Sequence, residues 1–316
     1  MDTPLIQTKD LVKYFNTKRG NLHAVDHVNI SIMKGETLGV VGERGCGKST
    51  LGRTILRLLE PTSGEILYNG QNIVDYSTKQ MKEMRKKMQI IFQDPFTSLN
   101  PRMSVSEIIA EPMITTKTLK NNTERLDRVY RLMETVGLAE RFINSYPHEL
   151  DGGRRQRIGI ARALSVDPEF IVCDEPVSAL DVSIQAQILN LMMDLQDEMG
   201  LTYMFVTHNL SVIKHISNNI AVMYLGQCVE HAPTNELFAH PQHPYTKALL
   251  NAIPIASLKD RKKLEIIKGE VTSPINPKPG CRFADRCPYV TDRCREDGLK
   301  LREVAPKHYV ACRLHE

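Results

Sequence analysis

Short apolar segments alternate with amphipathic ones along most of the chain. The segments ETLGVVG (36–42), EFIVCDEP (169–176) and LTYMFVTH (201–208) contain apolar runs of strand length. Apolar residues recur at helical spacing in STLGRTILRLL (49–59) and SIQAQILNLMMDLQDEMG (183–200). Buried strands that alternate with amphipathic helices are typical of an α/β fold.

Two further patterns flank this α/β core. The segments AVDHVNISI (24–32) and GEILYNG (64–70) alternate in polarity or carry a turn signal, which predicts a small antiparallel sheet near the N-terminus. From about 104 to 165 the pattern is helical, and TERLDRVYRLMETVG (123–137) ends at Gly137, a typical helix stop. We therefore expect an antiparallel β subdomain and a helical subdomain.

Length and charge narrow the possible functions. The chain has 316 residues, enough for one large domain or two of ordinary size. A net charge of +4, 6% aromatic residues and no Trp do not favour a nucleic-acid partner. The sequence contains no apolar run of about 20 residues and no secretory leader pattern near its start. We therefore expect a protein of the cytosol.

The composition changes after about residue 252. Proline and a charged run, LKDRKKLEIIKGE, are followed by TSPINPKPG, which predicts a linker. We expect one domain over 1–252, with its helical subdomain at about 104–165, and a C-terminal extension over 253–316. Four of the seven cysteines lie in this extension, at Cys281, Cys287, Cys294 and Cys312.

The spacing of these cysteines is C-x5-C-x6-C-x17-C. In a cytosolic chain such clustering favours metal or iron–sulfur ligation over disulfides. Thiolates can hold either a 4Fe-4S cluster or tetrahedral Zn²⁺. Structural zinc sites usually contain pairs of cysteines separated by only about two to four residues. The wider spacing here makes zinc less favoured, but zinc stays an alternative.

The segment GERGCGKST (42–50) fits the phosphate-loop pattern G-x-x-x-x-G-K-[ST], between a predicted strand and a predicted helix. Backbone N–H groups of such a loop surround phosphates, and the helix N-terminus adds a partial positive charge. Lys48 is expected to reach the β- and γ-phosphates, and the Ser49 hydroxyl to hold Mg²⁺. The predicted loop comprises Gly42, Glu43, Arg44, Gly45, Cys46, Gly47, Lys48, Ser49 and Thr50.

Two carboxylates end the apolar strand FIVCDEP. Asp174 is placed to bind Mg²⁺ and Glu175 to polarise an attacking water, which suits phosphoryl transfer because its catalysis is mostly positioning and charge stabilisation. His208, directly after the strand LTYMFVT, is a candidate contact for the γ-phosphate. The plain alternatives are an acidic strand end and a turn histidine.

Five motifs in order carry a resemblance to a known family. The series GERGCGKST, IIFQDPFTSLNP (90–101), HELDGGRRQR (148–157), IVCDEPVSALD (171–181) and FVTH (205–208) resembles the ATPase subunit of an ABC transporter over residues 5–250. The segment PTNELFAHPQHPYTKALLNAIP and the cysteine motif resemble the oligopeptide/dipeptide/nickel importer subgroup. The F-type ATPase subunit of peptide importers is similar over nearly the whole chain.

The resemblance implies a P-loop NTPase core and further site residues. Gln93 matches the residue that contacts Mg²⁺ and couples nucleotide state to the membrane subunits. Phe15, with Tyr14 beside it, matches the aromatic that stacks on adenine, although an ordinary strand aromatic is the alternative. Asp181 matches the loop that crosses the dimer interface. Arg44, where the subgroup often has serine, is expected to point to solvent.

The same resemblance implies cofactors and partners. Members of the family bind ATP and Mg²⁺ between two ATPase subunits. Each site is formed by the phosphate loop of one subunit and the signature segment of the other, which corresponds to HELDGGRRQR in this chain. We expect a second ATPase subunit of a different sequence, two transmembrane permease subunits and an extracytoplasmic solute-binding protein. The chain would then lie on the cytoplasmic side of the cell membrane, and its cysteines would hold a 4Fe-4S cluster.

The signature segment departs from the family pattern Leu-Ser-Gly-Gly-Gln. This chain has Leu150 followed by Asp151, Gly152, Gly153 and Arg154. A serine both caps the helix and donates to phosphate, whereas an ionised aspartate only accepts. Capping is worth about 1 kcal/mol, but a carboxylate about 4 Å from a phosphate charge would cost about 4 kcal/mol. We therefore expect Asp151 to cap its own helix, with an arginine near the phosphate.

These observations predict an ATP-hydrolysing subunit of a peptide-type ABC importer. Nickel or another small solute stays open as the cargo. Two other classes are a soluble ABC ATPase acting as a mechanical or assembly factor and a small-molecule kinase. The first commonly carries tandem cores or a long coiled-coil insert, and the sequence contains neither. The second leaves HELDGGRRQR unexplained.

Overall fold

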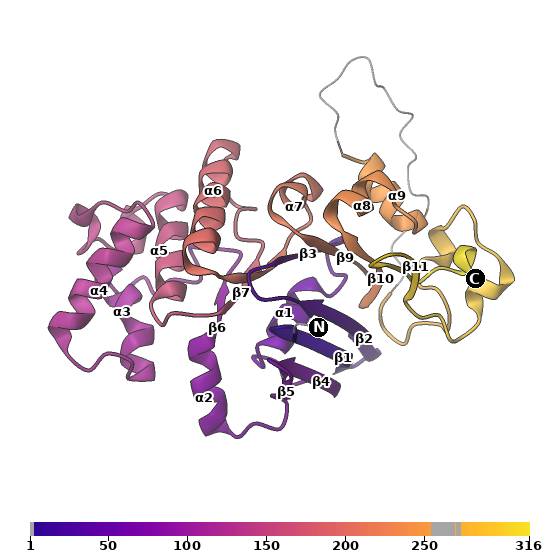
Figure 1. Cartoon of the computed structure of the whole chain (residues 1–316), viewed down its shortest axis with the longest axis horizontal. Coiled ribbons are helices and arrows are strands. Elements are labelled where there is room, and N and C mark those ends of the chain that lie inside the picture. The colour runs from indigo at the N-terminus through magenta and orange to yellow at the C-terminus, as the bar shows by residue number, and fades with distance from the viewer. Residues whose placement is uncertain (1–2, 254–268, 270–272) are drawn as a thin grey trace, which may run out of the picture. The chain divides into compact units, whose positions relative to one another are not determined.

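The computed structural model describes residues 3–253, 269 and 273–316 (Figure 1). The chain forms two compact units. The first comprises Met1–Met33, Thr37–Val74 and Phe205–Glu316, and the second comprises Lys34–Glu36 and Asp75–Met204. The N-terminal and C-terminal parts of the chain thus share one unit.

An antiparallel sheet forms the N-terminal part of the first unit, as the sequence predicts. Its strand order is β2 (Gly20–Ile32), β1 (Ile6–Thr17), β4 (Ser63–Tyr68), β5 (Gln71–Asn72). On β2, buried Val28 and Ile30 alternate with exposed His27 and Asn29, so one face of the strand packs on the core.

A second sheet in this unit contains the strand that precedes the phosphate loop. Strand β3 (Thr37–Val41), buried at all five positions, runs parallel to β9 (Asn219–Tyr224). β10 (Gln227–Pro233), β12 (His308–Val310) and β11 (Arg302–Ala305) continue it by antiparallel pairing. The helices of the unit are α1 (Lys48–Ile55), α7 (Leu210–Ile216), α8 (Thr234–Ala239) and α9 (Pro244–Asn251).

The predicted helix over 49–59 is shorter than the pattern suggested. α1 ends at Ile55 because Arg57 adopts a left-handed backbone, with φ of 50°. The Arg57 guanidinium donates to the carbonyl of Ile73 at 2.8 Å and pairs with Glu60 at 2.9 Å. These contacts replace the last helical turn with a tight turn.

The second unit holds the remaining helices. β6 (Met88–Ile91) and β7 (Phe170–Asp174) pair in parallel, and the unit boundary after Met204 divides β8 (Thr202–Val206). The helices are α2 (Thr78–Lys87), α3 (Val105–Thr116), α4 (Asn122–Thr135), α5 (Gly152–Leu164) and α6 (Val182–Met199). α3 packs against both α4 and α5, which confirms the helical character predicted for 104–165. Gly137, with φ of 65°, follows the end of α4 as predicted.

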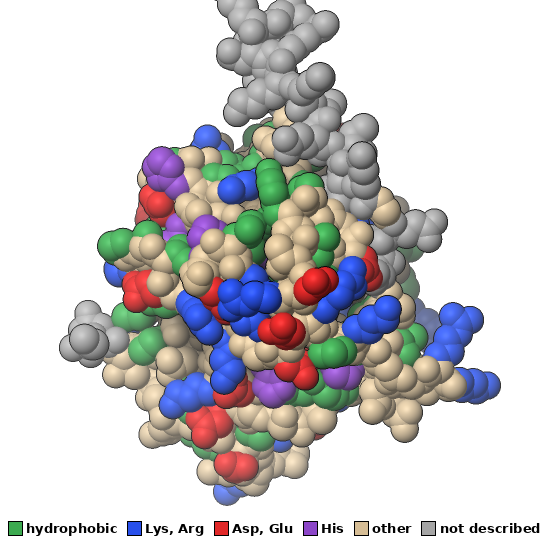
Figure 2. Space-filling view, turned by 90° about the vertical axis from the view of Figure 1, so that its right-hand side faces the viewer, with side chains coloured by type: hydrophobic (Ala, Val, Ile, Leu, Met, Phe, Trp, Pro, Cys, Tyr) green, Lys and Arg blue, Asp and Glu red, His purple; other side chains and the backbone are tan. Residues whose placement is uncertain are grey.

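The C-terminal segment is built into the first unit. The predicted linker falls largely outside the described residues, and the proposed domain boundary at 252/253 stays a prediction. Ile275 forms a β-bridge with Leu22, and β12 pairs with β10. Figure 2 shows acidic and basic side chains intermingled on the face that carries this segment. This pattern agrees with its exposed ion pair between Arg295 and Asp285.

A buried ion pair joins this segment to the sheet. Glu230 on β10 and His308 on β12 are both fully buried, with Oε1 and Nε2 2.7 Å apart. The N–H groups of Gln242 and His243 also donate to Glu230, at 2.8 and 2.9 Å. Burial acts to raise the pKa of Glu230, but these hydrogen bonds outweigh it and lower the pKa. The bond to Glu230 raises the pKa of His308.

The His308→Leu variant is expected to lose about 3–5 kcal/mol of unfolding free energy, because it leaves the Glu230 carboxylate buried without its cation. The raised pKa of His308 stabilises the fold fully below 6.5, its ordinary value, and this contribution is lost as pH rises through the folded-state pKa. The lowered pKa of Glu230 stabilises above 4.5 and is lost as pH falls through its folded-state value.

Denaturant unfolding at several pH values checks this expectation. The difference in unfolding free energy between wild type and variant should be largest between pH 4.5 and pH 6.5, the two ordinary pKa values. It should shrink toward alkaline pH. His315→Leu, which changes an exposed histidine of the same segment, serves as the control. A difference that grows at alkaline pH would contradict the assignment.

Candidate functional site

The phosphate loop links β3 to α1, as predicted. Its glycines are required by close packing: a Cβ at Gly47 would lie 2.0 Å from the carbonyl oxygen of Ala24, and one at Gly42 would lie 2.2 Å from that of Met223. Gly47 is also the N-cap of α1, and no side chain among the described residues caps this helix. The first N–H groups of α1 are therefore suited to an anion.

Lys48 is held over the loop by the carbonyl groups of the loop. Its side chain is buried, and its ammonium donates to the carbonyl oxygens of Gly42 at 2.8 Å and Glu43 at 3.0 Å. Ser49 and Thr50 follow at the helix start and are half-buried. Arg44 is exposed, as expected from the sequence. Exchange of the two carbonyls for phosphate oxygens would keep the ammonium paired.

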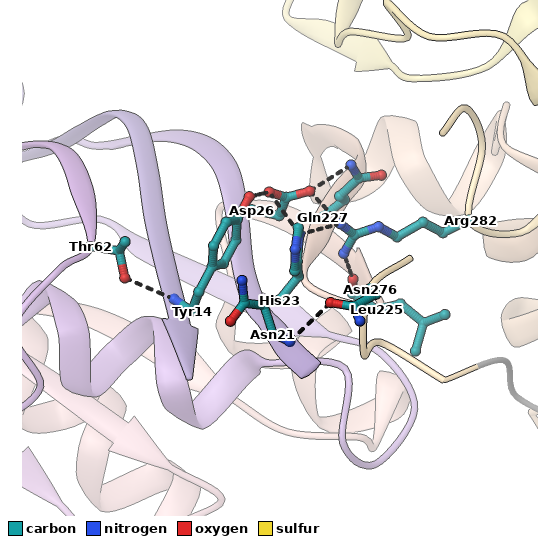
Figure 3. Close-up of polar contacts among 9 residues, drawn as sticks. All are labelled: Tyr14, Asn21, His23, Asp26, Thr62, Leu225, Gln227, Asn276 and Arg282. Carbon is teal, nitrogen blue, oxygen red and sulfur yellow. Dashed lines mark hydrogen bonds and ion pairs between the residues drawn. The ribbon is translucent and has the colours of Figure 1, made fainter. Parts of the chain in front are cut away.

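Two neighbouring aromatics on β1 differ in their surroundings. Tyr14 stacks on the His23 ring, with centroids 3.8 Å apart, and its hydroxyl donates to the Asp26 carboxylate (Figure 3). Burial and this hydrogen bond raise the pKa of Tyr14. Phe15 is half-buried, with the Lys13 ammonium 4.9 Å from its ring centroid. The ring and hydroxyl of Tyr14 are thus committed, which favours Phe15 as the adenine contact.

The acidic residues at the end of β7 form a second cluster, in the second unit. Asp174 and Glu175 are buried, and Glu175 adopts φ of 48°, a left-handed conformation that is rare outside glycine. Gln93 donates from Nε2 to Glu175 Oε2 at 3.0 Å. Ser178 donates to the Glu175 carbonyl from its hydroxyl at 3.1 Å. Gln93 and the candidate base therefore lie together, and the predicted Mg²⁺ contact of Gln93 stays a prediction.

The signature helix begins at the unusual aspartate. The Arg154 N–H donates to Asp151 Oδ1 at 2.8 Å, and the Arg154 guanidinium pairs with Oδ2 at 2.8 Å. Both oxygens of Asp151 thus bond to its own helix, which confirms the predicted cap. Gly153 faces α6, since a Cβ there would lie 2.8 Å from Ile184 Cγ2, and a Cβ at Gly152 would lie 3.1 Å from Leu180 Cδ2.

The predicted site residues divide between the two units. Phe15, the phosphate loop and exposed His208 belong to the first unit. Gln93, Asp174, Glu175, the signature residues and Asp181 belong to the second. Asp181 is exposed at the N-cap position of α6. The structure brings residues together within each set, and the roles assigned to individual residues stay predictions.

Sequence reasoning missed two arginines of the C-terminal segment. Arg282 pairs with Asp26, and Arg286 pairs with Glu43 of the phosphate loop at 2.9 Å. Both arginine side chains are almost completely buried, at 4% and 8% exposure. No local sequence pattern predicts these contacts, because the partners lie more than two hundred residues apart in the chain.

The four C-terminal cysteines are neighbours. Burial raises the pKa of Cys281 to about 11, and the thiols of Cys312, Cys287 and Cys294 contribute to the increase. The Cys281 N–H donates to the carbonyl of Cys294 at 2.7 Å, and Cys294 Sγ lies 3.4 Å from Thr291 Oγ1. Within the described ranges, no group of three or more His, Cys, Asp or Glu side chains is arranged to hold a single metal ion.

Comparisons with known proteins match both parts of this arrangement. The family model described as ABC transporter matches residues 25–178, and the model described as oligopeptide/dipeptide transporter, C-terminal region, matches residues 229–294. The oligopeptide transport ATP-binding protein AppF of Bacillus subtilis (strain 168) is 50% identical over 321 residues, covering 98% of this chain and 97% of that protein. The chain belongs to the ABC transporter ATPase family.

Another relative and two solved structures agree with this assignment. The dipeptide transport ATP-binding protein DppF of Haemophilus influenzae is 48% identical, covering 98% of this chain and 97% of that protein. The dimeric ATP-binding cassette MJ0796 bound to ADP and Pi has a TM-score of 0.67 and 29% identity, covering 72% of this chain and 98% of that chain. For cbiO1 of Clostridium perfringens the values are 0.67 and 29%, with coverage of 75% and 92%.

The fold is therefore that of an ABC ATPase, and the phosphate loop belongs to an ATP-binding protein. In the part of the chain that the structure describes, no helix combines the length and apolar character needed to cross a membrane.

Proposed function

We propose that this chain is the ATP-binding and ATP-hydrolysing subunit that powers a peptide-type ABC importer. The observation that carries the proposal is similarity over nearly the whole chain to ATPases named for oligopeptide and dipeptide transport. The similarity includes the C-terminal region, where residues 229–294 match the family model for the C-terminal region of oligopeptide/dipeptide transporters.

The chain contributes nucleotide contacts, a base for the attacking water and Mg²⁺ ligands to hydrolysis. Lys48 and the N–H groups at the start of α1 bind phosphates, and Phe15 stacks on the adenine. Glu175 orients and polarises the attacking water, and His208 contacts the γ-phosphate. Mg²⁺ would neutralise phosphate charge when bound, and the residues that would hold it are Ser49 of the first unit and, in the second unit, Gln93 and Asp174. These donors fit the cation, because Mg²⁺ prefers oxygen ligands and keeps several waters.

The partners follow from the family. The chain pairs with a second ATPase subunit, of a different sequence, and binds two permease subunits on the cytoplasmic side of the cell membrane. An extracytoplasmic binding protein delivers the peptide. ATP binding closes the pair and hydrolysis reopens it, so the chemical step is coupled to a conformational switch.

We propose that the four C-terminal cysteines hold a 4Fe-4S cluster, with zinc as the alternative. Four neighbouring thiols can supply the four ligands of such a cluster. A structural zinc site requires the four ligands to converge tetrahedrally on one ion. The cluster would cross-link a segment that has few apolar residues of its own and would stabilise its fold.

The substituted signature makes the two ATP sites of the assembled pair different. Asp151 keeps the cap but lacks the hydroxyl that donates to phosphate, and its charge is neutralised by Arg154. The site formed by this signature and the phosphate loop of the partner therefore lacks one neutral donor. The site formed by the phosphate loop of this chain uses the signature of the partner instead.

The importer assignment is tested by assembly and transport. Co-expression with the permease and second ATPase encoded by neighbouring genes should yield one membrane complex whose ATP hydrolysis rises when peptide-loaded binding protein is added. Glu175→Gln should lower hydrolysis at least about a hundredfold while ATP binding persists, because the base is lost and the phosphate contacts remain. Glu198→Gln, an exposed change in the same unit, is the control. Stimulation by nickel but not by peptides would contradict the proposed cargo.

The cysteine assignment is tested by metal analysis. Full-length protein purified without oxygen should show broad visible absorbance and about four iron atoms per chain. Cys294→Ser should lose most of this iron, whereas Cys228→Ser, outside the cluster, should retain it. Zinc in place of iron, or neither metal, would refute the cluster.

The signature assignment is tested in the assembled pair. Asp151→Ser restores the donor and retains a cap of similar strength, so folding stability should stay within about 0.5 kcal/mol of wild type. The hydrolysis rate should change severalfold, because one of the two sites gains a phosphate contact. An unchanged rate would remove the proposed difference between the sites.

A further inference from the structure

Two arginines between Cys281 and Cys287 contact two parts of the ATP-binding unit. Arg282 follows the first cysteine and pairs with Asp26 on β2, and Arg286 precedes the second and pairs with Glu43 in the phosphate loop. All of these residues belong to the first unit. One seven-residue segment therefore contacts the unit at two separate places.

The Arg286 contact fixes the phosphate loop. Its two terminal nitrogens donate to the two carboxylate oxygens of Glu43, at 2.9 and 3.2 Å, which is the forked geometry that guanidinium favours. The Glu43 N–H donates to the Tyr245 hydroxyl at 2.8 Å, and its carbonyl accepts from the Lys48 ammonium at 3.0 Å. Glu43 is thus fixed at its side chain and its backbone, and it positions the lysine that contacts phosphate.

The Arg282 contact fixes the strand pair that presents the adenine aromatic. Asp26 accepts hydrogen bonds from Tyr14, Arg282 and Gln227, and it lies beside His23 (Figure 3). Burial acts to raise the pKa of Asp26, but the Tyr14 hydrogen bond and the Arg282 charge outweigh it and lower the pKa. Tyr14 immediately precedes the adenine candidate on β1, so its anchorage fixes the backbone of the next residue.

The same strand pair is held a second time, closer to its turn. Phe15 lies opposite Leu22 in the β1–β2 register, and Leu22 forms the β-bridge with Ile275. Asn276 accepts from the Asn21 N–H through its side chain at 2.9 Å (Figure 3). The C-terminal segment therefore lies along the strand edge beside Phe15.

A single turn connects the two anchor points. The Leu225 carbonyl accepts from Arg282, the Gly226 carbonyl accepts from the Asp26 N–H at 2.8 Å, and the Gly226 N–H donates to the Cys46 carbonyl at 2.8 Å. A Cβ at Gly226 would lie 3.1 Å from Arg282 Nη1 and 2.4 Å from the His23 carbonyl oxygen, so the turn requires glycine here. The turn contacts Arg282 through the Leu225 carbonyl, and it is held to the phosphate loop by its own Gly226 N–H, a backbone bond that a substitution of Arg282 leaves in place.

We propose that Arg282 and Arg286 are positioning residues of the ATP site, Arg282 for its adenine end and Arg286 for its phosphate end. The inference rests on the proposed ATP binding by Phe15 and Lys48. The segment from Cys281 to Cys287 is then part of the nucleotide-binding machinery, although it touches no nucleotide itself. Each arginine acts through one acidic residue, Asp26 or Glu43.

Binding of two probes to the full-length chain separates the two roles. The probes are Mg-ATP and magnesium tripolyphosphate, which keeps the phosphates and lacks the base, and dissociation constants are measured by calorimetry. Arg286→Met should weaken both probes about tenfold. Arg282→Met should weaken Mg-ATP about tenfold and leave tripolyphosphate within about twofold of wild type. Arg295→Met, which breaks the exposed pair with Asp285, should change neither.

A double variant distinguishes position from charge at the phosphate end. Arg286→Met leaves the Glu43 carboxylate near the incoming phosphates, and Glu43→Gln removes that charge. If Arg286 acts by position, the weak binding persists in the double variant. Recovery of wild-type affinity would overturn the positioning role of Arg286. Where a methionine variant fails to fold, the lysine variant at the same position gives the same comparison, since lysine keeps the charge but cannot form the fork.

The remaining outcomes are also decisive. Wild-type affinity for both probes in Arg282→Met and Arg286→Met would overturn the inference while leaving the proposed function intact. Equal losses for both probes in both variants would show a general structural role and overturn the division between adenine and phosphate ends. A wild-type chain that fails to bind Mg-ATP would overturn the proposed function itself.

Discussion

A buried carboxylate at Asp26 places a strong constraint on the ATP-binding unit. Removing such a charge from water costs several kcal/mol unless a cation and hydrogen bonds compensate it. Arg282 supplies the cation, while Tyr14 and Gln227 supply hydrogen bonds. The compensation joins three parts of the chain, because these partners come from β1, β10 and the C-terminal segment. The strand pair that carries Phe15 is thereby stabilised by residues from distant parts of the chain.

Two helices in the chain begin at glycine-rich segments, but their N-termini are capped differently. α1 begins at Gly47, where no side chain of the described residues caps the helix, so an anion can take its N–H groups. α5 begins at Asp151, whose carboxylate already binds the helix backbone and the Arg154 guanidinium. The first N–H groups of α1 can therefore bind an anionic ligand, whereas one of the first N–H groups of α5 is already bonded to Asp151.

Local pattern was enough to predict the elements and motifs. The phosphate loop, the acidic end of β7 and the cap at Asp151 depend on residues close in sequence, and the structure places each at the predicted element. Two kinds of feature could not be predicted. The early end of α1 depends on a contact of Arg57 with Ile73, and the arginine contacts depend on partners more than two hundred residues away. A single sequence does not show which residues pair at that distance. The contacts of Arg282 and Arg286 with Asp26 and Glu43 could therefore not be predicted.

The ion pair between Asp26 and Arg282 also orders events during synthesis. The two residues are 256 positions apart, so Arg282 is translated long after Asp26. Glu230 likewise precedes its partner His308 by 78 positions. Both buried carboxylates therefore stay without their cations until the C-terminal segment has been translated. A nascent chain that already contains every nucleotide-binding motif still lacks the charges that hold the site together.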